Sequence, residues 1–379
     1  MENSLRSMEA AMNYIDDINI GHLPHRLFTG LWDGGHIQGI ALDKAHRFLY
    51  CSFTTQLVKL DLKGHMIGSV RGLLGHLGCL AFNKQDGKLY GSLEFKQDAI
   101  GQGILRNISS DKQLETAFYV AVFDVDKIDR LDMDAEKDGI MTTVWLSEVV
   151  ADHLACWKQD SVLVRSRHGC SGIDGITFGP DFGAKADSKF FLCVAYGIYG
   201  DTKRQDNDYQ VLLQYDTENW NQLAQRLNQD KMHRSGPVHC RNKYFVLTGN
   251  TEWGVQNLEY DPFTGHWLMA VYSGRKKQYP NYTLFLVDGT RPAVNKPLQG
   301  DPDDRQGDVL SLADAGRRDV KTGLRGWFFP HGSTGLYAFG HGLYYFALHK
   351  KIENQYAADI CLYRWNGQSD GPFEQVTEI

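Results

Sequence analysis

The chain has 379 residues and a formal net charge of −6 at pH 7, and charged residues make up 23% of it. A net negative charge gives no general attraction to phosphate backbones or anionic lipids, so we expect neither a nucleic-acid nor a membrane partner. The seven cysteines are scattered and never spaced as CxxC, and the N-terminal residues lack the apolar segment of a secretory signal. These features predict reduced thiols and a cytoplasmic protein.

Residues 1–25 are expected to form an N-terminal extension that is partly helical. The segment RLFTGLW at 26–32 follows it and has the composition of a short strand. We expect this segment to pair with the last repeat of the chain, which would join the two ends and close a ring of sheets.

A set of three short strands recurs five times along the chain. In each set, a glycine-containing apolar strand is followed by an aromatic strand and then by a strand that ends in Asp, Asn or Gly, which are turn residues. The five first strands are QGIAL (38–42), GHLGCLAF (75–82), SGIDGITF (171–178), GVQNLEYD (254–261) and GSTGLYAF (332–339). Between the sets, MTTVWLSEVV (141–150) and KYFVLTGN (243–250) are candidate outer strands. The helical spacing of apolar residues in NWNQLAQRLNQD (219–230) predicts a surface helix.

Repeated meanders of short strands with few helices indicate an all-β fold of radial or sandwich type. We predict one β-propeller domain over residues 1–379, with five blades and small helical insertions. The long intervals between some repeats leave room for six or seven blades. Aligning the first strands places five residues in one register, namely Gln38, Gly78, Asp174, Gln256 and Thr334.

Within residues 34–70, the sequence of the first repeat follows the pattern xGIAxDxxxRxLYxSx…LxxLDLxG. It resembles the blades of NHL-type and regucalcin-like propellers. The resemblance implies that the first strand of each blade lines a central channel. It also implies that the loops leading into the first strands share one face with the loops between strands two and three. Regucalcin-like proteins hold calcium at this channel with acidic and amide side chains. The counterparts here are Asp174, Gln38, Gln256 and Asn257, but the first blade lacks the glutamate at its start.

Three histidines stand in the loops that lead into first strands. His36 and His76 each precede their aligned channel position by two residues, and His331 precedes its own by three. Trp253 occupies a nearby place in the fourth repeat. Imidazole binds zinc or manganese and transfers protons near neutral pH, so these histidines are candidate metal ligands or acid–base groups. The ordinary alternative is that each one is a solvent-facing residue at the start of a strand.

The loops after second strands are long and contain cations and tyrosines. The candidates are Lys203 and Arg204 in one loop, Arg275 and Lys276 in another, and Tyr196 and Tyr272 at the starts of these loops. Arginine forms paired hydrogen bonds with carboxylates and phosphates, and tyrosine stacks on sugars, so this rim suits an anionic ligand. The alternative is that the cations are simply solvated.

These residues lead to three functional hypotheses. The first is a lyase or hydrolase that acts on an anionic small molecule or oligosaccharide, with a uronate-type sugar favoured. It uses His36, His76, Tyr196, Tyr272 and Asp174 in catalysis, with or without a divalent metal (Mn, Zn or Ca) held by His36, His76 and His331. The second is a calcium-dependent lactonase or phosphoester hydrolase of regucalcin type. The third is a propeller that binds a glycan or protein without catalysis.

Overall fold

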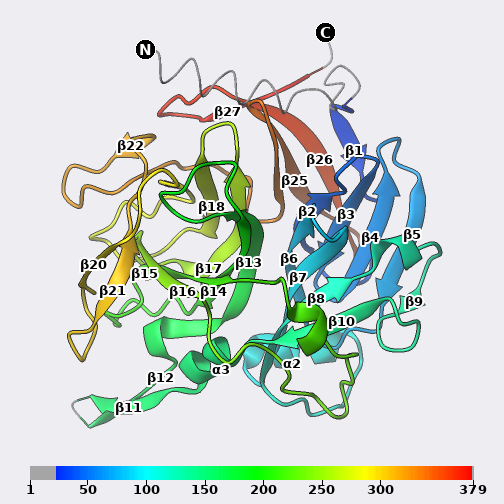
Figure 1. Ribbon diagram of the computed structural model, residues 1–379, viewed down its shortest axis with the longest axis horizontal. Coiled ribbons are helices and arrows are strands. Elements are labelled where there is room, and N and C mark those ends of the chain that lie inside the picture. Colours follow the sequence, from blue (N-terminus) through cyan, green and yellow to red (C-terminus); the bar gives the residue numbers. More distant parts are fainter. Residues whose placement is uncertain (1–22, 160, 378–379) are drawn as a thin grey trace.

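The computed structural model describes residues 23–159 and 161–377 of the chain. Most of the expected N-terminal extension, residues 1–22, therefore lies outside the described residues. Figure 1 shows the blue and cyan sheets on one side, the green and yellow sheets on the other, and the red sheet between them. The five inner strands contact one another in a closed circle, β2 with β6, β6 with β13, β13 with β17, β17 with β24, and β24 with β2. The fold is a five-bladed β-propeller, as the sequence repeats predict.

Blades 1 and 2 are antiparallel four-stranded sheets. Blade 1 consists of β2 (Ile37–Leu42), β3 (Phe48–Phe53), β4 (Gln56–Asp61) and β5 (Met66–Arg71), and the short β9 (Met133–Asp134) pairs parallel to β5. Blade 2 consists of β6 (His76–Asn83), β7 (Lys88–Phe95), β8 (Ala117–Phe123) and β10 (Met141–Trp145). The predicted outer strand at 141–150 is thus confirmed for its first half, because the remainder begins helix α3 (Ser147–Leu154).

Blades 3 and 4 form the other side of the ring. Blade 3 consists of β13 (Cys170–Pro180), β14 (Phe190–Ile198), β15 (Tyr209–Tyr215) and β16 (Asn242–Leu247), and it is extended by β21 (Gln306–Leu310) and β20 (Val294–Pro297). Blade 4 consists of β17 (Glu252–Asp261), β18 (His266–Tyr272) and β19 (Leu284–Val287). The position of β16 confirms the predicted outer strand at 243–250.

Blade 5 joins the two ends of the chain. It consists of β24 (Leu336–Gly340), β25 (Leu343–Ile352), β26 (Gln355–Trp365) and the N-terminal strand β1 (Arg26–Phe28), with β27 (Phe373–Gln375) also on β26. Strand β1 pairs antiparallel with β26, with Leu27 opposite Ile360, so the predicted closure by RLFTGLW is confirmed.

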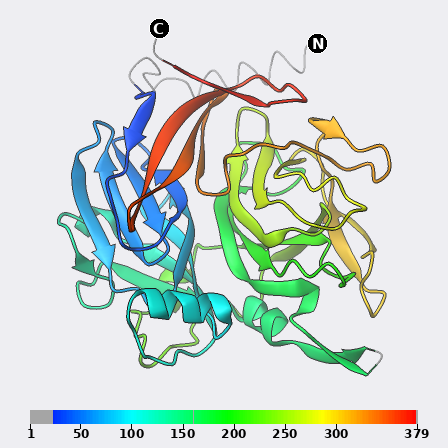
Figure 2. The same ribbon diagram turned by 180° about the vertical axis from the view of Figure 1, so that it is seen from behind.

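The remaining elements are short and lie outside the blades. Helix α2 (Ala99–Asn107) connects β7 to β8, and α2 and α3 lie at the same end of the molecule in both views (Figure 1, Figure 2). The hairpin of β11 (Cys156–Gln159) and β12 (Val162–Arg165) projects from that end. The 3-10 turns η2 (Val125–Lys127) and η3 (Arg167–Gly169) and the pair β22 (Arg317–Arg318) and β23 (Arg325–Gly326) complete the described elements.

The helix predicted over 219–230 is wrong beyond its first turn. Helix α4 covers only Trp220–Leu223, and the backbone is extended at Ala224. Gln225 instead bridges to Thr143 of β10, and the side chain of Leu227 is buried. Pairing with a neighbouring strand gives these backbone groups their partners, so a helical period in the side chains does not produce a helix here.

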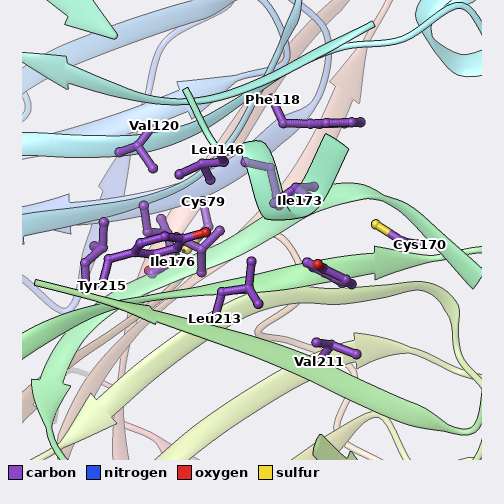
Figure 3. Close-up of a cluster of buried hydrophobic side chains, with 14 of the residues drawn as sticks. Cys79, Phe118, Val120, Leu146, Cys170, Ile173, Ile176, Val211, Leu213 and Tyr215 are labelled. Atoms are coloured by element: carbon purple, nitrogen blue, oxygen red, sulfur yellow. Dashed lines mark hydrogen bonds between the residues drawn. The ribbon is translucent and has the colours of Figure 1, made fainter. Parts of the chain in front are cut away.

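The core lies between the faces of adjacent blades. Figure 3 shows part of the layer between blades 2 and 3, where Val120, Leu146, Ile176 and Leu213 pack together with Cys79. Burying such side chains contributes about 25 cal/mol for each Å² removed from water, which makes these layers the main source of stability. All seven cysteines are free thiols, and in the described part of the chain no helix is long and apolar enough to cross a membrane.

Candidate functional site

The inner strands of blades 1 to 4 are irregular at the places predicted to line the channel. Each strand interrupts its pairing with the second strand of its blade at that point, and the residues passed over include Gln38, Gly78, Asp174 and Gln256. A bulge turns a side chain away from the regular pleat. The positions aligned in the sequence therefore coincide with irregularities in the strand pairing. We call the group of His36, Gln38, His76, Asp174 and Gln256 the channel mouth.

Four buried ionisable side chains gather at the mouth around His76. Its Nδ1 lies 3.4 Å from Oδ1 of Asp174 and 3.5 Å from Oε1 of Glu94. The same oxygen of Glu94 forms an ion pair with Nζ of Lys96 at 2.5 Å. Each of the four residues is exposed by 8% or less. Buried charges of this kind are retained only where they compensate one another.

The protonation of this cluster follows from its charges. Burial opposes a charge on His76, but the carboxylates of Asp174 and Glu94 outweigh it and raise the pKa of His76. Burial also opposes a charge on Glu94, but Lys96 and His76 hold its pKa at about 2. For Asp174, burial is the largest effect and raises the pKa, and the negative charge of Glu94 raises it further. The charge of His76 lowers it only in part, so the pKa of Asp174 is about 7. Near neutral pH, Asp174 is therefore close to its midpoint, beside an imidazole whose pKa is raised.

Backbone groups and glycines fix the two carboxylates in place. The backbone N–H of Ile173 donates to Oε2 of Glu94 at 2.9 Å, and Nε2 of Gln256 donates to Oδ2 of Asp174 at 3.1 Å. A Cβ on Gly78 would lie 2.7 Å from Oδ1 of Asp174, and one on Gly172 would lie 1.9 Å from Oε2 of Glu94. The carboxylates thus occupy space that only glycine leaves open.

His36 lies beside this cluster but has the opposite protonation. Burial lowers its pKa to about 4, with the positive charges of His76 and His349 adding to the effect. Nε2 of Gln38 lies 3.1 Å from Nε2 of His36 and donates to the hydroxyl of Thr54 at 3.0 Å. Because an amide nitrogen only donates, His36 accepts through Nε2 and is a neutral imidazole at neutral pH.

The side chains expected to hold calcium do not fit a calcium site. The side-chain amide of Asn257 donates to the backbone oxygens of Gln38 and Ser333 at 2.8 and 3.2 Å, and its oxygen accepts from the thiol of Cys79. Calcium needs six to eight converging oxygens. The oxygen of Asn257 already accepts from Cys79, and Asp174 is paired with an imidazole, so too few free oxygens converge here to coordinate calcium.

His331 and Tyr196 are not part of the cluster around His76. The ring of His331 packs on Phe329 and Tyr363 of the blade 5 core, with centroid distances of 5.4 and 5.9 Å. The hydroxyl of Tyr196 donates to Asp152 in the core between blades 2 and 3, and burial raises its pKa well above the usual value. Among the described residues, no group of three or more His, Cys, Asp or Glu side chains is placed to hold a metal ion.

The expected rim of cations is largely occupied by internal ion pairs. Arg204 bonds to Asp206 and to two backbone oxygens of the β12 region, and Arg275 pairs with Glu252 at 3.0 Å. Lys276 is not on the rim at all, because it is only 4% exposed and its Nζ contacts Asp208 and Asn207. Lys203 is exposed and makes no ion pair within the described ranges.

Tyr272 and Trp253 are placed near the mouth. Burial and the nearby carboxylate of Asp174 raise the pKa of Tyr272, so its hydroxyl keeps its proton at neutral pH. Trp253 has a left-handed backbone, with φ of 66°, and its carbonyl accepts from Nε2 of Gln256 at 3.0 Å. A non-glycine residue in this conformation is strained, which is common at functional sites.

Sequence reasoning missed Glu94, the residue that organises the cluster and forms the ion pair with Lys96. Glu94 lies at the end of β7 and Lys96 directly follows the strand, so the two residues are two positions apart and point to the same face. Two opposite charges on one face of a buried strand are the signal that could have identified them.

Helix α2 covers the outer side of this cluster. Its N-cap, Asp98, accepts from the backbone N–H groups of Ile100 and Gly101, and it also accepts from the hydroxyl of Tyr199 at 2.7 Å. The cavity left between α2, His76 and Lys96 is about 10 Å³, which is room for one water molecule at most. The space beneath α2 therefore has no room for a small-molecule ligand.

No protein-family model matches the chain, and no curated protein sequence is significantly similar to it. Solved structures that resemble it include a Dos1 propeller, with 11% identity and a TM-score of 0.32 over 90% of this chain and 71% of that one. The β-propeller domain of Cps50 (Swd1) from Myceliophteria thermophila is similar at 9% identity and a TM-score of 0.31, over 89% of this chain and 99% of that one. Likeness at this level carries no argument about function, and the propeller is established by the strand pairing itself.

Proposed function

We propose that the channel mouth is the active site of an enzyme that transfers protons on an anionic small molecule or oligosaccharide, most concretely a uronate-type sugar. The observation that carries the proposal is the placement of His76 between Glu94 and Asp174, with the pKa of Asp174 at about 7. A carboxyl group near its midpoint at neutral pH is suited to both taking up and giving back a proton.

The three groups have different roles in a β-elimination. The imidazolium of His76 neutralises the substrate carboxylate, which acidifies the proton on the adjacent carbon. Asp174 removes that proton, a carbon–carbon double bond forms, and the bond from the β-carbon to the leaving oxygen breaks. Tyr272, which keeps its proton at neutral pH, donates it to that oxygen. Asp174 and Tyr272 return to their starting states by exchanging protons with solvent.

The anion is received mainly by His76, because Glu94 already neutralises Lys96. Gln256 holds Asp174, and Gln38 with neutral His36 offers hydrogen bonds to sugar hydroxyls. On the outer rim, Lys203 is the cation left to meet a longer oligosaccharide. Hydrolysis of the glycosidic bond by the same carboxyl groups is the alternative reaction, and the product distinguishes the two.

The test uses oligosaccharides of galacturonate, glucuronate and mannuronate. Elimination produces an unsaturated product that absorbs in the ultraviolet, hydrolysis produces only reducing ends, and a non-catalytic glycan-binding propeller produces neither. We expect His76→Gln and Asp174→Asn each to lower kcat by about 10²-fold or more, as for the loss of an acid–base group. Lys203→Gln, at an exposed residue that is not one of the proposed acid–base groups, should raise KM and leave kcat unchanged. Turnover that survives both mouth variants would show that the chemistry lies elsewhere, and a lack of turnover on all three sugars would remove uronates.

A further inference from the structure

A second cavity lies at the outer edge of blade 3, on strands that take no part in the channel mouth. It has a volume of about 380 Å³ and is lined by residues of η3, β16, β20 and β21. This volume lies within the range of small-molecule sites. No element of the sequence pattern pointed to it, because β20, β21 and η3 fall between the recognised repeats.

The lining of this cavity is predominantly cationic. Arg167, Arg241, Lys243 and Arg305 contribute four positive charges, and Asp308 contributes the one negative charge. His168 also lines the cavity, but burial lowers its pKa to about 4 and leaves it neutral. The lining thus has an excess of positive charge in a protein whose net charge is −6.

The acids that balance these cations lie outside the cavity lining. Asp152, which is 1% exposed, pairs with Arg167 at 3.1 Å and also contacts Lys243. Asp181 pairs with Arg241 at 2.7 Å, and Arg305 pairs with Asp301 at 3.1 Å and with Asp303 at 3.2 Å. Lys243 also pairs with Glu148 at 2.8 Å. Each pairing uses only part of the five N–H donors of a guanidinium. Nε of Arg167 is buried and has no hydrogen-bond partner among the described residues.

The cations are also held in place before any ligand binds. Ser166 and His168, on either side of Arg167, have left-handed backbones with φ of 62° and 55°, which L-residues seldom adopt. The guanidinium of Arg241 lies 4.3 Å from the ring centroid of Phe191. Strained backbone and fixed side chains of this kind are typical of preorganised binding sites.

We propose that this cavity binds a phosphorylated small molecule, with the phosphate on Arg167, Arg241 and Arg305. Each guanidinium already pairs with at least one carboxylate, so a singly charged anion gains little, whereas a phosphate ester or diphosphate carries enough charge to engage the remaining donors together. The fork of a guanidinium also matches the oxygens of phosphate. Asp308 and its bonded neighbour Asn295 lie on the same wall and can accept and donate to the uncharged part of the ligand. The site is separate from the channel mouth and does not depend on the proposed enzyme activity.

The test is calorimetric titration of the whole chain with inorganic pyrophosphate, a hexose phosphate and, for comparison, the singly charged anion acetate. We expect the first two to bind and acetate to bind at least about tenfold more weakly. Arg241→Gln and Arg305→Gln should each lower the affinity for pyrophosphate about tenfold or more, as for the loss of one charge-assisted hydrogen bond. Arg318→Gln, on the exposed strand β22 and without an ion pair in the described part of the chain, is the control and should bind normally.

Two results would overturn the proposal. The first is pyrophosphate binding that is absent, or that is equal in wild type and in both cavity variants. The second is equal affinity for acetate and pyrophosphate, which would mean a general anion surface. Urea unfolding of the two variants confirms that they are folded, and Arg167→Lys provides an independent check, because it keeps the charge but removes the fork. It should weaken pyrophosphate binding and preserve the ion pair with Asp152.

Discussion

The substitution Asp174→Asn should separate stability from activity at the channel mouth. It removes the carboxyl group with the raised pKa but keeps its shape and an oxygen that accepts from Gln256. A carboxyl group whose pKa is higher in the folded state than in the unfolded state lowers stability as the pH rises between the two values. The wild type should therefore lose stability as the pH rises from about 4 to about 7, and the variant should not.

The size of the effect follows from the two pKa values. The pKa of Asp174 rises from 3.8 to about 7 on folding. At about 1.4 kcal/mol for each pKa unit, this difference amounts to about 4 kcal/mol. Near pH 4 the carboxyl group is largely neutral in both states, so wild type and variant should be similar. Above pH 7 the variant should be more stable than the wild type by a large part of that amount.

The assay is urea unfolding of both proteins across this pH range, with the difference in free energy of unfolding plotted against pH. Asp187→Asn, at an exposed carboxylate without an ion pair in the described residues, is the matched control and should give a flat difference. If the Asp174→Asn difference is also flat, the pKa of Asp174 is not raised in the folded protein, and the observation that carries the proposed function is wrong. If the variant is both more stable and still fully active, the proposed function fails while the pKa argument stands.

Two further substitutions test the ion pair and the ring closure. Glu94→Gln leaves Lys96 buried without its counter-charge and should lower the free energy of unfolding, measured in urea, by about 3–5 kcal/mol. Adding Lys96→Met should recover most of this loss, and a double variant as unstable as the single one would contradict the ion-pair argument. Leu27→Ala, at a residue of β1 that is 6% exposed, should cost about 2–5 kcal/mol, but Leu31→Ala, at 42% exposure, should change stability by less than about 0.5 kcal/mol. Equal losses from the two leucines would mean that β1 does not hold blade 5 together.

The blades could be predicted because their signal is local. Each strand set consists of short apolar and aromatic strands and ends in a turn residue, so five repeats are visible without any knowledge of long-range contacts. The closing strand β1 was also predictable, because a ring needs a partner for the edge of its last sheet. The prediction of a helix over 219–230 failed for the opposite reason, because the backbone of Gln225 pairs with Thr143, which is distant in the sequence. A helical period describes side chains and does not reveal a competing strand.

The protonation of the site could not be predicted, because it depends on neighbours from other strands and blades. His36 and His76 occupy the same place in successive repeats, yet one is neutral with a pKa of about 4 and the other has a raised pKa. The difference comes from two residues near His76. Glu94 is its pairing partner on β7, and Asp174, at the channel position of the next blade, lies beside its ring.

In the first blade, the same two positions carry no charge. Thr54 stands opposite His36, where its backbone N–H donates to the His36 carbonyl, and the channel position of the next blade is Gly78. An imidazole without a carboxylate loses its proton on burial, and one between two carboxylates keeps it. The repeat therefore fixes where the histidines are, and two non-repeated side chains decide that only His76 can act as a cation. It follows that the charge at the mouth is a property of the junction between blades 2 and 3, and that substitutions at Glu94 and Asp174 control it more strongly than any change at His36.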